Sequence, residues 1–387
     1  MSEAEPSAVT DWDAPSINVK RIIRWCMWGC VLISLAVVGW GYAQYWPAIE
    51  GEEIANKVAI RSSGVIDQPA KHLAPGFTDS QGRLLADPPT SPDQFADPAT
   101  IVLGRWEPTS DTRPDIAWQA FEKHLSEAIG RPVKEINYDN SAAQIEQLKK
   151  GEITLVALHA ADAPFLVNNC GYQPAAVLAD DSNAISGNRL DIIVPPKSAI
   201  QSPADLRDHT LVCAVPASIT GYRAAVALLM HDERLRPNVD YIITFSLKQK
   251  ASIKGVTQNK FEAAAVSDDK LRSMLDSGKV TKDQFRAVYQ SEVIPRMTIG
   301  WFYNLKPELA DKIRQAILSY KPTPVKIASS KPTTDPSGGD ADAAADADST
   351  QESGMLHWIP TDYKKDFQLV RTIDDLFDPR LDTKAVK

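Results

Sequence analysis

The stretch that decides the fold is SAIQSPADLRDHTLVCAVPASITGY, residues 198–222. Its central part, TLVCAVP (210–216), is a short apolar run that predicts a buried strand. The residues that follow, SITGYRAAVALLMHD (218–232), are predicted to open a helix. A strand that passes through a Ser, Thr and Gly turn into a helix is a unit of α/β folds, in which helices cover a mostly parallel sheet.

The same alternation of strand and helix extends on both sides of this stretch. Before it, the pattern predicts strands at 100–106, 133–139 and 152–159, with helices at 115–129 and 141–151. A further apolar strand, LDIIVPP, covers 190–196. After it, the pattern predicts strands at 241–246, 260–267 and 297–304, and helices at 251–259 and 307–320.

Two successive α/β series favour two lobes, although one continuous doubly wound sheet is the alternative. We take the Pro195-Pro196 break as the crossover between lobes. Lobe 1 is then predicted to comprise 100–195 with 297–321 and 355–378, and lobe 2 to comprise 196–296. Residues 322–354 have almost no large apolar side chains, so we expect a disordered insertion there.

The N-terminal region predicts a membrane anchor at residues 25–47. No charged side chain occurs from Trp25 to Ile49, and a helix of this length can cross a hydrocarbon core of roughly 30 Å. Positive residues precede it and acidic residues follow it, which places the tail 1–24 in the cytoplasm: Lys20, Arg21, Arg24, then Glu50, Glu52 and Glu53. A cleaved signal peptide is the alternative, but Gly41-Tyr42-Ala43 is a poor cleavage site.

Residues 48–99 are rich in Pro, Gly, Asp and Ser, which predicts an extended extracytoplasmic linker with little secondary structure. The net charge of -8 gives no overall basic field for nucleic acid. Cys170 and Cys213 lie in the soluble part, where an oxidising compartment would permit a bridge or leave two buried thiols.

Nothing in the chain argues for an enzyme, a metal or a cofactor. The sequence contains no P-loop, no Gly-x-Ser-x-Gly elbow and no paired Cys or His at zinc-ligand spacing. Its histidines are scattered, at positions 72, 124, 159, 209, 231 and 357.

The turn 217–221 predicts an anion site. At a helix N-terminus, backbone N–H groups and the helix dipole favour a negative charge. Ser218 and Thr220 add hydroxyl donors, and Gly221 permits close backbone approach. The alternative is that Ser218 or Thr220 only caps the helix.

From about Ile101 to Phe377, apart from 322–354, the chain resembles periplasmic solute-binding proteins of phosphonate- and phosphate-type ABC importers. The matched segments occur in the family's order: 120–153, 198–222, 245–269 and 293–304. This resemblance implies a type 2 periplasmic-binding-protein fold, in which two α/β lobes close on a small anion. It also implies that Ile219 and Tyr222 belong to the binding motif, with Gln249 and Lys250 nearby.

The chain departs from the family at several ligand positions. The family's Ser-Thr-Ser becomes Ser218-Ile219-Thr220, its lid tyrosine aligns with Ser141, and its His-Asp pair aligns with Gln249-Lys250. The acidic residue that ends the family's later strand is approximated by Glu262. Lys250 can contact a compact oxyanion or be a solvated surface charge, and His159, at a strand end, can face the ligand or bond only to backbone.

The sequence therefore predicts a single-pass protein of the cytoplasmic (inner) membrane with its soluble domain on the periplasmic side. We expect it to bind a phosphate- or phosphonate-like oxyanion and to deliver it to an ABC permease. The alternative is a tethered sensor or accessory subunit that binds another membrane complex without transport.

Overall fold

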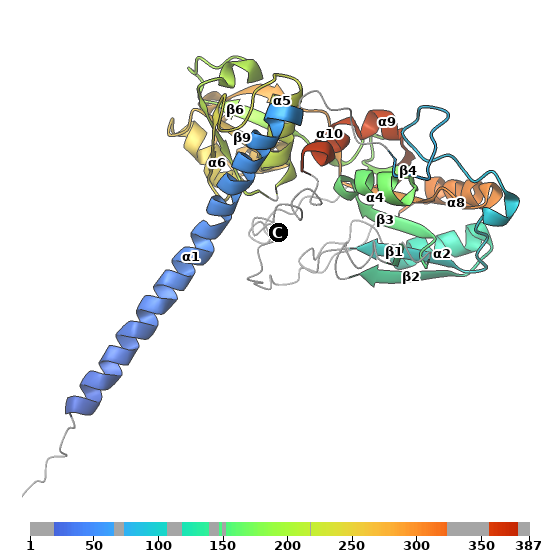
Figure 1. Ribbon diagram of the computed structural model, residues 1–387, viewed down its shortest axis with the longest axis horizontal. Helices are drawn as coiled ribbons and strands as arrows, with labels where there is room; N and C mark the ends of the chain where they lie inside the picture. The colour runs from blue at the N-terminus through green and yellow to red at the C-terminus, as the bar shows by residue number, and fades with distance from the viewer. Residues whose placement is uncertain are drawn as a thin grey trace, which may run out of the picture.

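The computed structural model describes residues 19–65, 73–106, 118–138, 147–148, 152–216, 218–322 and 356–377. It contains one long N-terminal helix and two α/β lobes, each built on its own sheet (Figure 1). Of the predicted insertion, 322–354, all residues except Pro322 lie outside the described residues.

Lobe 1 is built on a six-stranded sheet in the order β13-β4-β12-β3-β1-β2. Strands β1, β2 and β3 are parallel, as the sequence predicted, whereas β12, β4 and β13 add antiparallel pairs. The bounds are β1 Ile101–Trp106, β2 Val133–Tyr138, β3 Leu155–His159, β4 Tyr172–Ala179, β12 Met297–Phe302 and β13 His357–Pro360.

Helices α2 (Trp118–Ile129) and α8 (Pro307–Ser319) pack together on one face of this sheet. The buried residues of α2 recur at helical spacing: Trp118, Phe121, Leu125 and Ile129. They join the buried face of α8 and the strands in one apolar cluster. The opposite face carries α4 (Ala163–Cys170), which follows β3 and the 3-10 turn η2 (Ala160–Asp162).

Lobe 2 is built on a five-stranded sheet in the order β10-β6-β9-β7-β8. Strands β7, β8 and β9 are parallel, and β6 and β10 are antiparallel to their neighbours. The strands are β6 Leu190–Val194, β7 Thr210–Cys213, β8 Ile242–Phe245, β9 Ala263–Ser267 and β10 Arg286–Gln290. The helical elements are η3 Pro203–Leu206, the π-helical turn η4 Ile219–Arg223, α5 Ala224–His231, α6 Gln249–Thr257, α7 Asp268–Asp276 and η5 Lys282–Gln284.

The crossover between lobes does not lie at Pro195-Pro196, as the sequence suggested. Strand β6, which precedes the two prolines, belongs to the sheet of lobe 2. The chain crosses instead at β5 (Gly187–Asn188) and returns at β11 (Ile294–Pro295), and these two segments pair antiparallel. The prolines end a fully buried strand because they cannot donate to the ladder, which does not require a change of lobe.

The last described elements are α9 (Tyr363–Asp366) and α10 (Gln368–Phe377). Helix α10 contacts α5 of lobe 2 and also α4 and η2 of lobe 1. Its buried residues Val370 and Ile373 join an apolar cluster that contains residues of both sheets. Helix α10 therefore lies between the lobes, where Figure 1 shows it.

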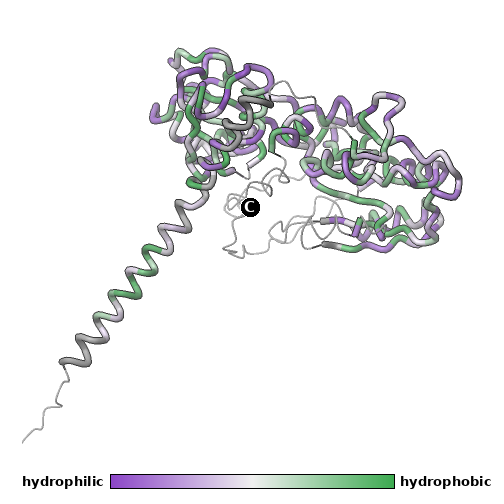
Figure 2. Tube along the Cα trace, viewed as in Figure 1, coloured by the Kyte–Doolittle hydropathy of each residue, from purple (hydrophilic) through white to green (hydrophobic). Residues whose placement is uncertain are grey.

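Helix α1 (Val19–Val65) contains the whole stretch predicted to be an anchor. Within the described part of the chain, no helix meets the length and apolarity that crossing a membrane requires. The exposed apolar side chains of α1 include Val31, Leu32, Ile33, Leu35, Val37 and Val38. Figure 2 shows this hydrophobic part of α1 where the helix projects from the lobes.

The prediction of an extended linker over 48–99 is wrong for the described parts of this range. Helix α1 continues to Val65, and its residue Ala55 is buried against lobe 2. Residues 73–99, which include the turn η1 (Pro92–Gln94), pack on lobe 1. Ala96 exchanges backbone hydrogen bonds with Asn304 and Lys306, and Ala86 accepts one from the Gln173 side chain. The polar turn residues of 73–99 indicated little secondary structure, which the structure shows. The few apolar residues of this segment, together with its hydrogen bonds, hold it on lobe 1.

Gly300, in the central strand β12, is required by close contact with β4. A Cβ at this position would lie 2.0 Å from the Gln173 carbonyl oxygen, which is backbone and cannot rotate away. We expect Gly300→Ala to lower the free energy of unfolding by about 3 kcal/mol through overpacking. Urea denaturation would measure this loss, with exposed Lys123→Ala as the control. Equal midpoints for the two variants would contradict the packing that the structure shows.

Candidate functional site

The carboxyl ends of three parallel strands meet at one edge of lobe 2. Ser218 follows β7, Gln249 follows β8 at the start of α6, and Ser267 ends β9. All three are buried polar residues. Ligands of open α/β sheets bind outside this edge, and the residues predicted from the motif 218–222 lie at it.

These residues form a hydrogen-bonded set that we call the edge network: Ser218, Gln249 and Ser267. The Ser218 hydroxyl accepts a hydrogen bond from the Gly221 backbone N–H at 3.0 Å and another from the Gln249 amide at 3.2 Å. The side-chain oxygen of Gln249, Oε1, accepts a hydrogen bond from the Ser267 backbone N–H at 2.7 Å. The Ser267 hydroxyl in turn donates to the Asp269 carboxylate. The network thus uses one of the backbone N–H groups of the turn 217–221, which the sequence predicted to be an anion site.

Gly221 lies against this network. A Cβ at Gly221 would be 2.7 Å from the Ser218 hydroxyl and 3.2 Å from the Gln249 amide nitrogen. Thr220 beside it is buried. Glycine is needed here for close packing, and the atoms that approach it are those of Ser218, Ala214 and Gln249.

The remaining predicted site residues have different positions. Tyr222 is fully buried, with its ring 5.3 Å from that of Phe245 and 5.5 Å from that of Phe377. Lys250 is partly exposed on α6. His159 ends β3 and begins η2. Ser141 lies outside the described residues.

The family resemblance suggested that Glu262 ends a strand, but Glu262 directly precedes β9. Its carboxylate accepts a hydrogen bond from the Thr210 backbone N–H at 2.8 Å and lies 3.3 Å from the His209 ring nitrogen. These partners lie at the amino end of β7, on the side of the sheet opposite the edge network. Glu262 therefore joins the strand starts and does not reach the cleft.

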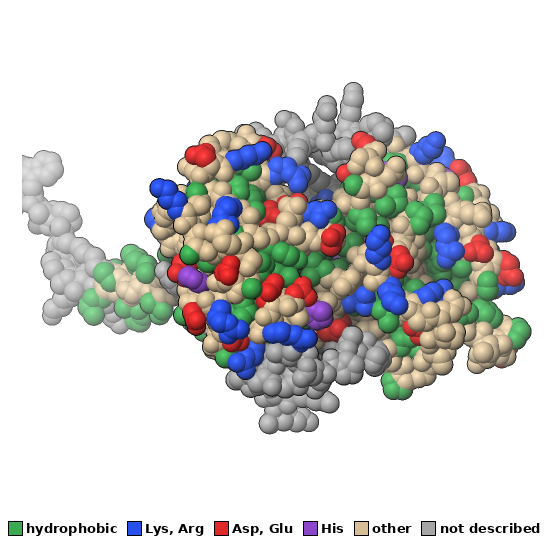
Figure 3. Space-filling view, turned by 90° about the horizontal axis from the view of Figure 1, so that it is seen from above, with side chains coloured by type: hydrophobic (Ala, Val, Ile, Leu, Met, Phe, Trp, Pro, Cys, Tyr) green, Lys and Arg blue, Asp and Glu red, His purple; other side chains and the backbone are tan. Residues whose placement is uncertain are grey.

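A cavity of about 250 Å³ lies between the lobes. Its walls come from the segment after β3, the turn η4, the return crossover and helix α10: Ala161, Asp162, Phe165, Ile219, Arg223, Ile294, Val370, Ile373, Asp374 and Phe377. Of the predicted site residues, Ile219 alone appears among these described lining residues. Figure 3 shows apolar side chains where the two halves of the molecule meet, bordered by charged ones.

Three charged residues line this mostly apolar cavity: Asp162, Arg223 and Asp374. Burial raises the pKa of the Asp162 carboxyl and Asp374 adds to this, whereas the electrostatic interactions with His159 and Arg223 lower it. Burial also lowers the pKa of the Arg223 guanidinium.

The Arg223 side chain is held in place from two sides. Its Nε donates to the Pro216 carbonyl oxygen at 3.1 Å, and its guanidinium lies 5.7 Å from the centre of the Phe377 ring. A guanidinium fixed in this way presents further N–H donors with a geometry suited to oxyanions. The cavity therefore contains a positioned cation that can bind an anion, together with a carboxyl group whose proton is held more tightly than usual.

Sequence reasoning missed Asp162, Arg223, Asp374 and Phe377. Arg223 directly follows the predicted motif 218–222, and Asp162 comes three residues after the predicted His159. A search for charged residues next to the predicted site residues would have found both. Asp374 and Phe377 were not accessible in this way, because their place depends on α10 folding back between the lobes.

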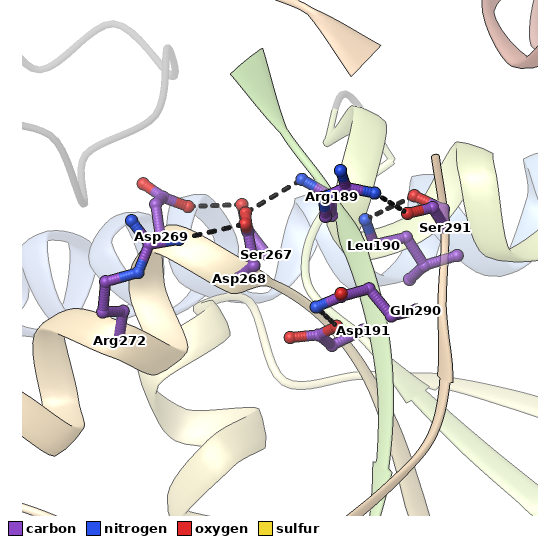
Figure 4. A network of polar contacts seen from close by, with 9 residues as sticks. All are labelled: Arg189, Leu190, Asp191, Ser267, Asp268, Asp269, Arg272, Gln290 and Ser291. Carbon is purple, nitrogen blue, oxygen red and sulfur yellow. Dashed lines mark hydrogen bonds and ion pairs between the residues drawn. The ribbon is translucent and has the colours of Figure 1, made fainter. Parts of the chain in front are cut away.

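A second polar network joins the crossover segments to the sheet of lobe 2 (Figure 4). The Arg189 guanidinium donates to the Ser291 carbonyl oxygen at 2.7 Å, and the Ser291 hydroxyl accepts from the Leu190 backbone N–H at 2.9 Å. Asp268, directly after β9, accepts from the Arg189 backbone N–H at 2.8 Å. The outgoing and returning segments are thus bound to each other and to the strand that ends in the edge network.

The edge network is expected to stabilise lobe 2 without any ligand. Gln249→Ala would leave the Ser267 N–H without its acceptor in a buried place, which should cost about 1–3 kcal/mol. Lys250→Ala, one residue further along α6, is the matched control and should change stability by less than about 0.5 kcal/mol. Urea denaturation of the ligand-free protein measures both. If Gln249→Ala unfolds at the wild-type midpoint, the network is not structural, and the predicted ligand role for Gln249 gains weight.

Asp162 is expected to make stability depend on pH. Because its folded-state pKa is raised above the ordinary 3.8, the folded state keeps the proton to higher pH than the unfolded state does. The free energy of unfolding therefore falls as pH rises from 3.8 through the raised value, and stability is recovered on acidification. Asp162→Asn should flatten this slope in Tm measured against pH, whereas exposed Asp311→Asn should keep it. A slope that survives in Asp162→Asn would refute the assignment.

The sequence matches one family model, described as the periplasmic substrate-binding protein of the phosphonate ABC transporter, over residues 109–350. That range is more than half of the chain. No curated protein matches the sequence.

Several solved structures are similar to parts of this one. A Xanthomonas citri protein bound to chloride ion shares 16% identity, covers 73% of this chain and 99% of its own, and gives a TM-score of 0.47. A binding component of a Pseudomonas aeruginosa ABC phosphonate transporter shares 15% identity over 75% of this chain and 100% of its own, with a TM-score of 0.36. PhnD1 from Prochlorococcus marinus, in complex with methylphosphonate, shares 13% identity over 72% and 100%, with a TM-score of 0.39.

The family match includes the turn 217–221 and both parallel-strand regions of lobe 2. The chain belongs to the family of periplasmic substrate-binding proteins of ABC phosphonate transporters.

Proposed function

We propose that this protein is a membrane-anchored extracytoplasmic binding protein that captures a small phosphate- or phosphonate-like oxyanion and delivers it to an ABC importer. The observation that carries the proposal is the cavity between the lobes, with Arg223 held at its wall beside the edge of the parallel strands. Lobes that contribute residues to one cavity can close on a ligand that contacts both.

The chemistry of the cavity supports an oxyanion. A guanidinium makes charge-assisted, bidentate hydrogen bonds to planar or tetrahedral oxyanions, and these are stronger in a site from which water is largely excluded. Asp162 would repel an anion when ionised. When it keeps its proton it becomes a donor, and burial shifts it in that direction. The apolar lining from Phe165, Ile219 and Phe377 suits a small organic substituent on the anion.

The anchor is proposed from the sequence and the exposed side chains of α1. The stretch 25–49 is uncharged, follows basic residues and precedes acidic ones. Val31, Leu32 and Ile33 are among its exposed apolar side chains, which would be costly in water and favourable in lipid.

A tethered sensor or accessory subunit is the second candidate, and two observations favour it. Helix α10 lies between the lobes and lines the cavity, so part of the cleft is already filled by the chain itself. The residues of the predicted anion cradle also satisfy one another through the edge network. A protein that used the fold only to bind another membrane protein would not need an open cleft.

Thermal stability of the full chain in lipid nanodiscs, titrated with phosphate, phosphite and methylphosphonate, separates the two candidates. A ligand at 100 times its Kd adds about 2.7 kcal/mol of stability to the folded state. We expect at least one of these oxyanions to raise Tm. Arg223→Met, which keeps an apolar stem against Phe377 but removes the charge, should abolish the shift.

Lys260→Met is the control, because it removes an exposed cation at the opposite edge of lobe 2. It should leave the oxyanion shift unchanged. The absence of a shift with every oxyanion, or a shift of the same size in Arg223→Met, would contradict the importer proposal and leave the sensor candidate.

A further inference from the structure

Helix α1 packs on lobe 2 with residues 51–56, which we call the docked segment. A Cβ on Gly51 would lie 2.7 Å from the Phe245 ring and 2.9 Å from the Pro216 ring, so the helix backbone lies directly on these two side chains. One turn further along, Ala55 is fully buried in the apolar cluster against which Phe245 also packs. Figure 1 shows this end of α1 against lobe 2 and the rest of the helix projecting from it.

Pro216 connects the docked segment to the cation of the cavity. Its ring faces Gly51, and its carbonyl oxygen accepts the hydrogen bond that the Arg223 Nε donates at 3.1 Å. The pyrrolidine ring fixes φ, so a displacement of the ring moves the backbone of the same residue with it. The position of α1 therefore affects the first of the two groups that hold Arg223.

The second group that holds Arg223, the Phe377 ring, is also linked to the docked segment. Gly51 lies on Phe245, whose ring is 5.3 Å from that of Tyr222. The Tyr222 ring is in turn 5.5 Å from that of Phe377, which lies 5.7 Å from the Arg223 guanidinium. Close-packed side chains transmit a displacement because the interior has few voids to absorb it. Two routes of packed groups thus join α1 to the same guanidinium.

We infer that Gly51 is a positioning residue for the oxyanion site: by contacting Pro216 and Phe245, the docked helix fixes the Arg223 guanidinium in the orientation that binds the ligand. This role rests on the proposed function, in which Arg223 is the cation that binds the oxyanion. The N-terminal helix then contributes to affinity as well as to location. By reciprocity, bound oxyanion and docked α1 stabilise each other.

Gly51 and Gly41, both in α1, provide matched variants for a test. Gly51→Leu places a side chain into Phe245 and Pro216, which forces the docked segment away from them. Gly41→Leu is the control, because a Cβ at Gly41 meets nothing within 4 Å. Both substitutions raise the helix propensity of α1 equally, so a difference between them reports the contact with lobe 2.

Two more variants separate positioning from a loss of stability. Gly51→Ala adds one methyl group at the same contact and is the milder form, which carries the test if Gly51→Leu does not fold. Gly255→Ala overpacks lobe 2 elsewhere, because its Cβ would lie 2.0 Å from the Phe261 ring. Phe261 packs against a different apolar cluster from the one that contains Ala55.

The Kd values of phosphate, phosphite and methylphosphonate are measured by calorimetry on the full chain in lipid nanodiscs, well below the Tm of each variant. For the oxyanion that the wild type binds most tightly, we expect Gly51→Leu to raise Kd at least about fivefold, as for coupled sites. Gly51→Ala should have an intermediate effect. Gly41→Leu should change neither Kd nor Tm, and Gly255→Ala should lower Tm and leave Kd unchanged.

Each contrary outcome has a separate meaning. A wild-type chain that binds none of the three oxyanions refutes the proposed function and the positioning role with it. Wild-type binding that both Gly51 variants retain at full affinity refutes the positioning role alone, even if their Tm is lowered. An equal loss of affinity in Gly255→Ala also refutes it, because any destabilisation of lobe 2 would then weaken binding.

Discussion

The structure depends on the close antiparallel contact between the two segments that cross from one lobe to the other. A Cβ on Gly187 would lie 2.0 Å from the Ile294 carbonyl oxygen, so β5 and β11 can pair only because residue 187 is glycine. Arg189 and Ser291 then bind the two segments to each other, and Asp268 binds them to β9. This arrangement places the carboxyl ends of β3 and β7 on either side of the crossover, and the cavity forms between them.

The cavity combines apolar packing with buried charge, and the two have opposite effects on stability. Helix α10 adds Val370 and Ile373 to an apolar cluster shared by both lobes, which stabilises the folded chain. Asp162 and Arg223 are buried beside it, and removing such groups from water costs free energy even when they attract one another. An arrangement that costs stability at one place in a protein is a reason to expect function there.

The sequence predicted the layers of the fold well, because they follow from periodicity. The helix at 115–129 and the strands around 210–216 lie nearly where the apolar pattern placed them. Residues 48–65 were predicted as linker, yet they continue α1, and Gly51 and Ala55 lie against lobe 2 because they are small enough for close approach. Pattern analysis detects large apolar residues and overlooks contacts that need small ones.

The site was harder to predict than the fold. The motif 218–222 lies at the carboxyl edge of the lobe 2 sheet, beside the proposed site, but local sequence could not show that Ser218 and Gln249 would bond to each other. Phe377 lines the cavity and its ring lies beside that of Tyr222, and only the tertiary fold brings together these two residues, which are far apart in the chain. Arg223 directly follows the motif, but its place at the cavity wall depends on the same fold.

The central claim is that a small oxyanion binds between the lobes, at the cavity that Arg223 and α10 line. Hydrogen exchange of the full chain with and without methylphosphonate tests it most directly. The account predicts slower exchange of backbone amides in 219–223 and in 368–377, with little change in the outer strands β2 and β10. Unchanged exchange at both cavity segments under saturating ligand, or protection confined to another surface, would contradict it.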